Sequence, residues 1–223
     1  MAVNDRVLSG GRVGALETNS VIRNTYILLA MTLAFSSVTA LVSLATAAPP
    51  LPWYLVLGGY FGLLFLTNAL RNSAWGIASV FALTGFMGYT LGPLLGFYLT
   101  AFSNGSQLVA MAFGGTAAIF LGLSGYALTT RKNFSFLGGF LFAGILVAFL
   151  AGLGGLLFSL PGLSLAVSAM FVLLMAGLIL WQTSELIHGG ETNYIMATVT
   201  LYVAIFNLFT SLLHLLGVFG GDE

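Results

Sequence analysis

The sequence predicts an all-α, polytopic membrane protein whose chain crosses the bilayer seven times. Three observations support this fold class: seven long apolar runs, six Lys and Arg residues that all lie outside those runs, and short segments between the runs. Hydrophobic residues make up 59% of the chain and charged residues 5%, whereas a soluble domain has about 25% charged residues. A chain of this composition exposes its apolar surface to lipid, so we expect the bilayer itself to be a partner.

Each apolar run is long enough to be a transmembrane helix, because a helix needs about 20 apolar residues to cross the hydrocarbon core. The segment 48–52 contains three prolines, which lack an amide donor and clash with the preceding helical turn. Short turns are predicted at 103–106, at Pro161 and Gly162, and at Gly189 and Gly190. The seven predicted helices are 25–47, 53–70, 74–100, 108–128, 134–158, 163–187 and 194–219.

The basic residues fall in alternate gaps between the runs. They are Arg6, Arg12 and Arg23 before the first run, Arg71 between the second and third, and Arg131 and Lys132 between the fourth and fifth. Since Lys and Arg are retained on the cytoplasmic side during insertion, we expect the N-terminus in the cytoplasm and the C-terminus outside. We expect residues 1–22 to form a flexible cytoplasmic tail and residues 23–223 to form the transmembrane domain.

Charge and cysteine content exclude several classes of function. The formal net charge is zero, so the chain has no basic surface of the kind that binds nucleic acid. It has no cysteine, which excludes disulfides and thiolate metal sites. HExxH, P-loop and paired-carboxylate motifs are absent from the sequence, so metalloprotease, NTPase and glycosidase chemistry have no support. We expect no cofactor and no bound metal.

Small residues recur at four-residue spacing in three of the predicted helices. Such a spacing places them on one helix face, where two helix backbones can approach closely. We therefore expect close helix packing at three stripes, which are Gly88, Gly92 and Gly96, then Gly114, Ala118 and Gly122, and finally Gly144, Ala148 and Gly152.

Gln182, Glu185 and Asn207 are the candidates for a polar core or a pore lining. Polar and ionisable groups at membrane depth are costly to bury, so they are functional candidates by default. The structural alternative for the two amides is that they form hydrogen bonds to neighbouring helices, each of which stabilises the bundle by about 0.6–2 kcal/mol. For Glu185 the alternative is that its carboxylate reaches water at the end of its helix. His188 and His214 lie at opposite sides of the predicted bundle, so they cannot share a metal ion.

Gly122 to Gly125 read as GxSG, the serine motif of rhomboid intramembrane proteases. A serine nucleophile needs a histidine base within hydrogen-bonding distance. The predicted second and sixth helices contain no histidine, and His214 lies toward the outer end of the seventh. The motif arises easily by chance in a glycine-rich helix, so we predict that the protein is not an enzyme.

The chain resembles the Bax inhibitor (TMBIM) family of seven-helix membrane proteins. The resemblance rests on GFMGYTLGPLLG at 85–96 and TLYVAIFNLF at 200–209, together with the segments 23–26, 128–139 and 187–194, and it extends from about residue 20 to residue 217. The last three segments resemble the proteobacterial branch, the modulators of the membrane-anchored AAA+ protease FtsH. The resemblance implies two groups of three helices around a central seventh helix.

The resemblance also separates two functions within the family. Calcium-leak members carry an aspartate on each of helices six and seven, and the corresponding positions here are Gln182 and Ala204. Neither side chain ionises, so a pH-sensing pair of carboxylates is absent. The function implied is therefore a non-enzymatic modulator, an inhibitor or competing substrate, of FtsH in the bacterial inner membrane. The alternative is a calcium or proton leak channel that lacks the di-aspartyl sensor.

Overall fold

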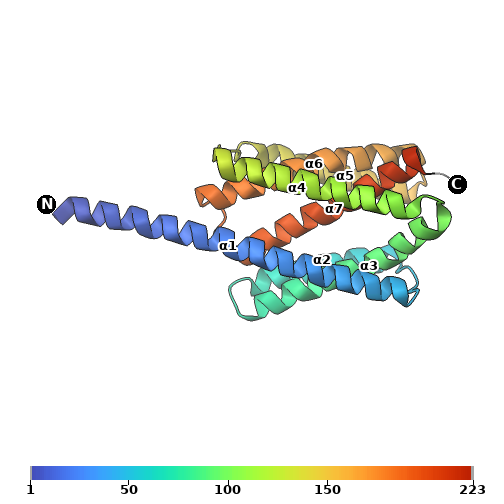
Figure 1. The fold of residues 1–223 in the computed structure, drawn as a ribbon, viewed down its shortest axis with the longest axis horizontal. Coiled ribbons are helices and arrows are strands. Elements are labelled where there is room, and N and C mark those ends of the chain that lie inside the picture. The colour runs from blue at the N-terminus through green and yellow to red at the C-terminus, as the bar shows by residue number, and fades with distance from the viewer. Residues whose placement is uncertain (1, 222–223) are drawn as a thin grey trace.

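The computed structural model describes the backbone of residues 2–221 and the side chains of residues 18–221. The described chain is all-helical, and its seven helices are all long and apolar enough to span a membrane. The prediction of a seven-helix polytopic protein is therefore confirmed. The helices are α1 (Ala2–Ala45), α2 (Trp53–Leu70), α3 (Trp75–Ala101), α4 (Gly105–Thr130), α5 (Leu137–Leu157), α6 (Pro161–His188) and α7 (Tyr194–Gly220) (Figure 1).

Three predicted helix starts after α1 were misplaced by two or three residues, and the first of them is α4, which begins at Gly105 within the turn predicted at 103–106 and not at residue 108. Pro161 and Gly162 are the first residues of α6, so the turn predicted there is wrong. Proline is well suited to the first helical position, where its missing amide would have had no partner. The fifth helix was predicted to start at residue 134, but α5 begins at Leu137. The preceding loop is held in place because the Phe134 amide donates to Ser184 Oγ at 2.9 Å.

α1 already includes the residues before the predicted start at residue 25, and the candidate span within the residues whose side chains are described is Thr18–Ala45. No helix-breaking residue separates the polar residues before position 25 from the apolar run, so the helix continues through them. Most of the tail predicted for residues 1–22 lies outside the residues whose side chains are described. Its flexibility stays a prediction.

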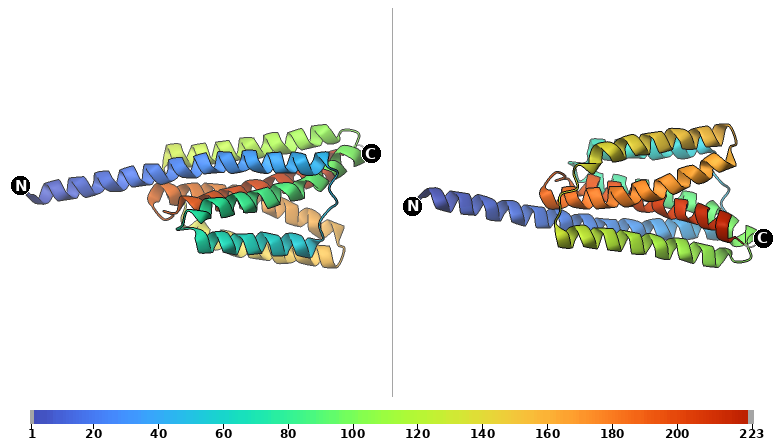
Figure 2. Two further views of the ribbon diagram at one scale, coloured as in Figure 1. Left: turned by 90° about the horizontal axis from the view of Figure 1, so that it is seen from below. Right: turned by 90° about the horizontal axis from the view of Figure 1, so that it is seen from above.

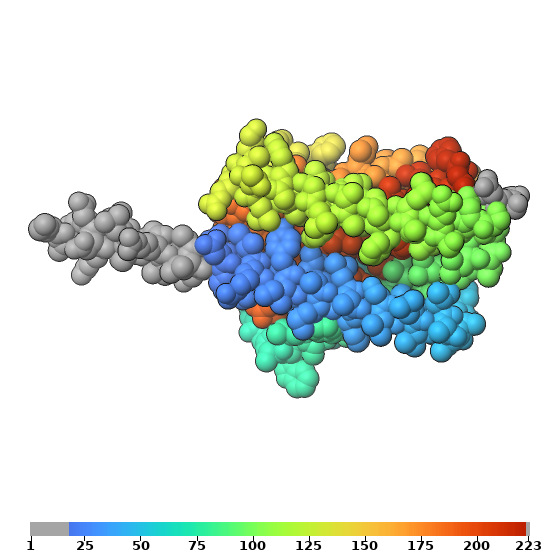
Figure 3. All heavy atoms as spheres, in the orientation of Figure 1, coloured from blue at the N-terminus to red at the C-terminus, as the bar shows by residue number. Residues whose placement is uncertain are grey.

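α7 lies between two groups of three helices, as the family resemblance implied. Within the first group α3 packs against α1 and α2, and within the second α6 packs against α4 and α5. α7 contacts α1, α3, α4 and α6, and it has the largest buried share of the seven candidate spans. Figure 3 shows one face of the molecule, where α1 and α4 cover much of α7.

α2 and α5 both lie on the side of the bundle away from α1 and α4 (Figure 2). The rings of Phe61 and Phe149 meet there edge to face, with their centroids 5.8 Å apart. Large apolar side chains on these two helices are exposed, including Phe65, Phe140 and Phe142. Because lipid is the solvent of a transmembrane surface, this exposure is the expected pattern for a bundle embedded in a bilayer.

Two of the three predicted small-residue stripes pack closely. A side chain added at Gly88 or Gly92 of α3 would collide with Ser36, Thr39 or Ser43 of α1. On α5, one added at Gly144 would lie 2.6 Å from Leu174 of α6. These contacts confirm close packing between α1 and α3 and between α5 and α6.

The prediction for the α4 stripe is wrong. Nothing lies within 4 Å of a Cβ added at Gly114 or Gly122, and both glycines are exposed. The buried face of α4 is a different one, which carries Ala112, Thr116 and Ser124. Spacing alone shows that small residues share a face, but it does not show which face meets a neighbour.

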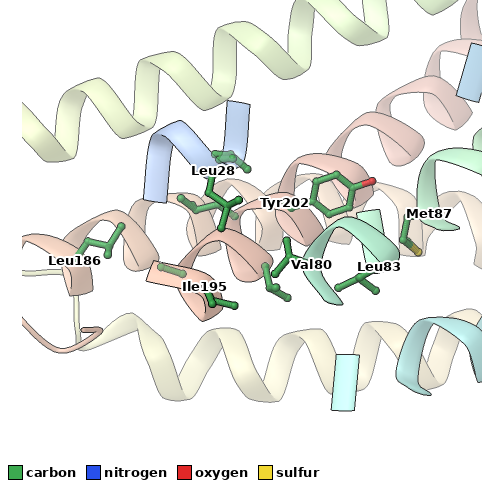
Figure 4. Close-up of a cluster of buried hydrophobic side chains, with 11 residues drawn as sticks. Leu28, Val80, Leu83, Met87, Leu186, Ile195 and Tyr202 are labelled. Carbon is green, nitrogen blue, oxygen red and sulfur yellow. The ribbon is translucent and has the colours of Figure 1, made fainter. Parts of the chain in front are cut away.

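The largest cluster of buried side chains joins α1, α3, α6 and α7. Figure 4 shows Leu28, Val80, Leu83, Met87, Leu186, Ile195 and Tyr202 of this cluster. The Tyr202 hydroxyl of α7 lies 2.6 Å from Ser36 Oγ of α1 and donates to the Thr84 carbonyl of α3 at 3.1 Å. One phenol therefore joins the central helix to two helices of the first group.

Candidate functional site

The described basic residues gather at one end of the bundle, which we call the basic end. Arg71 follows α2, and Arg131 and Lys132 follow α4. Asn193, just before α7, donates from Nδ2 to the Arg71 carbonyl at 3.0 Å, and His188, the last residue of α6, lies 3.1 Å from the Arg131 carbonyl. Both loops with basic residues are thus tied to the α6–α7 connection. This geometry is what the alternation of charge along the sequence predicts.

A layer of buried polar side chains lies just inside the basic end. The Tyr26 hydroxyl of α1 is 3.3 Å from Thr183 Oγ1 of α6, which is 3.4 Å from Ser124 Oγ of α4. Thr198 of α7 donates to the Thr25 carbonyl of α1 at 3.2 Å. Since a helix rises about 1.5 Å per residue, Ser124 and Thr183 lie about 8–9 Å from the ends of their helices at Thr130 and His188. The layer links one helix of the first group, two of the second, and α7.

Gln182 belongs to this polar layer and is fully enclosed by protein. Its side chain is 2% exposed, and its Nε2 has no hydrogen-bond partner among the described residues. The Oγ1 of Thr25 is likewise buried without a partner. A buried polar group without a partner costs free energy, so such groups are rare and mark hydrated or functional positions.

Glu185 lies one turn beyond Gln182, close to the end of α6. Its side chain is half-buried, and its Oε1 accepts a hydrogen bond from Ser135 Oγ at 2.5 Å. Its carboxylate also lies against Gly190, at the start of the α6–α7 connection. A carboxylate near a helix C-terminus is unfavourably placed with respect to the helix dipole, so the Ser135 hydroxyl offsets part of that cost. Glu185 thus fastens the α4–α5 loop to α6.

Asn207 lies apart from the other two candidates. It is near the middle of α7, about 20 Å along the helix axis from Tyr194. Its Nδ2 donates to the Val203 carbonyl of its own helix at 2.8 Å. Ala204, at the second position where calcium-leak relatives carry an aspartate, is fully buried in an apolar cluster with Ile179 and Leu208. The structure therefore brings Gln182 and Glu185 to the basic end and leaves Asn207 at mid-helix.

A second set of hydrogen bonds fastens the α4–α5 loop, and the sequence analysis did not predict it. Ser184 Oγ accepts from the Phe134 amide and donates to the Lys132 carbonyl at 3.3 Å. The two ring nitrogens of His188 lie 2.9 Å and 3.1 Å from the Ser184 and Arg131 carbonyls. Both of these partners are acceptors, so the imidazolium form donates to both while the neutral form donates to one. We call Ser184, Glu185 and His188 with their loop partners the loop clasp.

Asn193 is a further positioning residue at the basic end. Its side-chain oxygen accepts from the Ile195 and Met196 amides and so caps α7, while its Nδ2 binds the α2–α3 loop at Arg71 and Asn72. An asparagine directly before an apolar run is a helix-start signal, so the capping role could have been found in the sequence. The contact with the other loop depends on tertiary structure.

Ser124 has no histidine among its described hydrogen-bond partners. Its hydroxyl is buried and bonded to Thr183. His214 of α7 pairs with Ser168 of α6, with 2.7 Å between Nδ1 and Oγ. Ser168 and His214 lie toward the end of the bundle opposite the basic end, while Ser124 lies near the basic end. The serine of the GxSG motif, Ser124, is therefore separated from His214, and the serine that pairs with His214 is Ser168, which lies outside that motif.

The described residues contain no group of three or more His, Cys, Asp or Glu side chains arranged to hold a metal ion. The hydrogen bonds at the basic end are made by hydroxyls, amides, the His188 imidazole and two carboxylates, those of Glu185 and Glu191. Such groups hold helices and loops together and can bind water.

Comparison with known proteins places the chain in a family. The family model described as inhibitor of apoptosis-promoting Bax1 matches residues 18–221. An uncharacterized protein of Pseudomonas aeruginosa is 56% identical over 93% of this chain and 93% of its own length. A protein of Escherichia coli named modulator of FtsH protease YccA is 50% identical over 98% of this chain and all of its own length. A second Escherichia coli protein, with the same identity and coverage, is named inner membrane protein YccA. The chain therefore belongs to the Bax inhibitor family of membrane proteins.

Proposed function

We propose that this protein modulates an FtsH-type, membrane-anchored AAA+ protease in the bacterial inner membrane. The observation that carries the proposal is the 50% identity to the Escherichia coli modulator of FtsH protease, which extends over the whole of that protein. The similarity covers 98% of this chain and so includes all seven spans and the connections between them.

The architecture supports a function performed by the bundle and its termini. The connections between the seven helices are short in the described part of the chain, so no folded domain stands outside the bilayer there. We infer that the bundle contacts the protease complex by helix packing within the membrane. The N-terminal tail would lie in the cytoplasm, where an AAA+ ring could engage it. A bundle that resists unfolding would then occupy the protease and spare other membrane substrates.

Affinity purification from native membranes tests the proposed partnership. The protein carries a C-terminal tag, and the matched variant lacks residues 1–22. We expect the FtsH protease to co-purify with both forms if the bundle makes the contact, and with the full-length form alone if the tail makes it. Absence of the protease from both preparations would refute the proposal.

The relatives are named modulators or membrane proteins, and we propose that this chain also acts without catalysis. The support is the separation of Ser124 from both histidines in the hydrogen-bond network. A fluorophosphonate probe should leave Ser124 and Ser168 unlabelled in native membranes. Labelling that disappears in Ser124→Ala or in Ser168→Ala would contradict this part of the proposal.

The second candidate function is a calcium or proton leak. It is favoured by the buried Gln182 Nε2 and Thr25 Oγ1, which lack partners in a polar layer that reaches four helices. In this alternative Gln182, Glu185 and Asn207 line the pathway. Calcium or proton flux in proteoliposomes that is lost in Glu185→Ala would establish the leak, and flux equal to that of empty liposomes would exclude it.

A further inference from the structure

The imidazole of His188 bridges two main-chain carbonyls within the loop clasp. Its side chain is exposed at the end of α6, where water reaches it. Nδ1 lies 2.9 Å from the Ser184 carbonyl one turn earlier on the same helix, and Nε2 lies 3.1 Å from the Arg131 carbonyl in the α4–α5 loop. A carbonyl oxygen cannot donate, so each contact is a hydrogen bond only where the ring nitrogen carries a proton.

Only the imidazolium form of His188 serves both carbonyls. With a proton on Nδ1 alone, the lone pair of Nε2 faces the Arg131 carbonyl, and this tie to the loop is lost. With a proton on Nε2 alone, Nδ1 faces the Ser184 carbonyl with a lone pair, or it accepts from Ser184 Oγ, which lies 3.4 Å away. In the second case the Ser184 proton leaves the Lys132 carbonyl, to which that hydroxyl donates at 3.3 Å. Each neutral form therefore has one hydrogen bond fewer than the imidazolium.

The loop residue that His188 contacts has a left-handed backbone. Arg131 has a φ of 49°, a conformation that residues other than glycine adopt only at a cost in free energy. Its amide donates to the Ala127 carbonyl at the end of α4, and its carbonyl faces His188. Loss of the bond from Nε2 removes one of the two described main-chain contacts that hold Arg131 in this conformation. The loop is thus easier to release at Arg131 than a relaxed backbone would be.

Charges of both signs surround His188. Arg131 and Lys132 lie in the loop that it contacts, and Glu185 lies one turn earlier on α6. The sequence of α5 contains no titratable group. The other titratable groups near this end, on segments that adjoin or pack against α6, are Glu191 in the α6–α7 connection, Arg23 and Tyr26 of α1, Tyr126 of α4 and Tyr194 of α7. Among these side-chain types, histidine is the one whose ordinary titration range lies between pH 5 and pH 8.

We propose that His188 makes the loop clasp a pH-sensitive latch. On the acid side of the histidine titration range, the imidazolium bridges α6 to Arg131 and the α4–α5 loop is held. On the alkaline side the ring is neutral, one hydrogen bond is lost, and the loop detaches more often. The direction follows by linkage, because the latched state binds the proton more tightly than the released state does. The latch controls the loop that carries Arg131 and Lys132, and it does not depend on the proposed protease partner.

Amide hydrogen exchange of the full-length protein in detergent, measured at pH 6 and at pH 8, tests the latch. The rates are expressed as protection factors, so that the pH dependence of the exchange chemistry is divided out. We expect protection in residues 131–136 to be about threefold to tenfold lower at pH 8 than at pH 6. The loop at 71–74 is the internal control, because the Asn193 side chain that binds it does not titrate. Its protection should be the same at both pH values.

Two histidine substitutions separate the latch from other effects of pH. His188→Gln replaces the ring with an amide that does not titrate, so protection in residues 131–136 should be the same at pH 6 and pH 8. His214→Gln removes the other histidine of the chain, which pairs with Ser168 toward the opposite end of the bundle, and should keep the wild-type pH dependence. Protection in the wild type that is equal at the two pH values, or higher at pH 8, would overturn the proposal. So would a pH dependence that persists in His188→Gln or disappears in His214→Gln.

Discussion

The hydroxyl of Tyr202 in α7 lies 2.6 Å from Ser36 Oγ in α1, so the central helix and the first helix share a polar contact inside an apolar cluster. Interhelical hydrogen bonds in membrane proteins contribute about 0.6 kcal/mol on average and up to about 1.7 kcal/mol. We expect the free-energy contribution of this contact to lie toward the upper end of that range, because the same hydroxyl also donates to the Thr84 carbonyl of α3.

Tyr202→Phe should therefore lower the free energy of unfolding by about 1 kcal/mol. Ser36→Ala should have a similar effect, and the double variant should be less destabilised than the sum of the two. The measurement is thermal unfolding in detergent. Ser37→Ala is the control, since the exposed Ser37 hydroxyl bonds only to the Leu33 carbonyl of its own helix. Strict additivity of the two core substitutions would contradict a direct contact.

Packing between α1 and α3 yields a second prediction. Gly88→Ala should destabilise the bundle by about 1–3 kcal/mol, because the new methyl group meets the Ser36 carbonyl and the Thr39 side chain. Gly122→Ala on α4 has open space around it and should leave stability unchanged or raise it, since alanine favours helix more than glycine does. Both variants are compared by thermal unfolding. Equal effects at the two positions would contradict the packing described for α3.

The loop clasp yields a prediction about local motion. Ser184→Ala removes the acceptor of the Phe134 amide and the donor to the Lys132 carbonyl. Amide hydrogen exchange in residues 131–136 should become about fivefold to tenfold faster, while exchange in the helices is unchanged. Thr129→Ala is the control, because its hydroxyl bonds within α4 at the Gly125 carbonyl. Unchanged exchange at Phe134 in Ser184→Ala would show that the clasp does not hold the loop.

The orientation of the protein can be measured with single cysteines, because the natural chain contains none. Asn133→Cys lies in the α4–α5 loop at the basic end, and Ser103→Cys lies in the α3–α4 loop at the other end. A thiol reagent that does not cross membranes should label Ser103→Cys in intact spheroplasts and should label Asn133→Cys only after lysis. The reverse pattern would place the N-terminus outside.

Much of the fold could be predicted from the sequence because each helix is marked by its own residues. Seven apolar runs and the proline-rich segment 48–52 define the spans, and Arg71, Arg131 and Lys132 mark one end of the bundle. The central position of α7 came from the family resemblance. The amino-acid composition of the spans does not predict which helix is central, because every span is apolar.

The contacts at the basic end could not be predicted in the same way. Gln182 was identified as polar and deep, but the burial of its Nε2 without a partner depends on how the helices pack around it. Asn207 was grouped with it, although its amide bonds within its own helix. The open α4 stripe shows the same limit, since Gly114 and Gly88 have the same local spacing and opposite surroundings. Which face of a helix is buried is decided by the other helices.

The rate at which the FtsH protease degrades a model membrane substrate in proteoliposomes tests the central claim most directly. The rate is measured without this protein, with the full-length protein, and with a form that lacks residues 1–22. We predict that the full-length protein slows substrate degradation in proportion to its amount, and that removal of the tail weakens this effect. A degradation rate unchanged by an excess of the full-length protein would contradict the account.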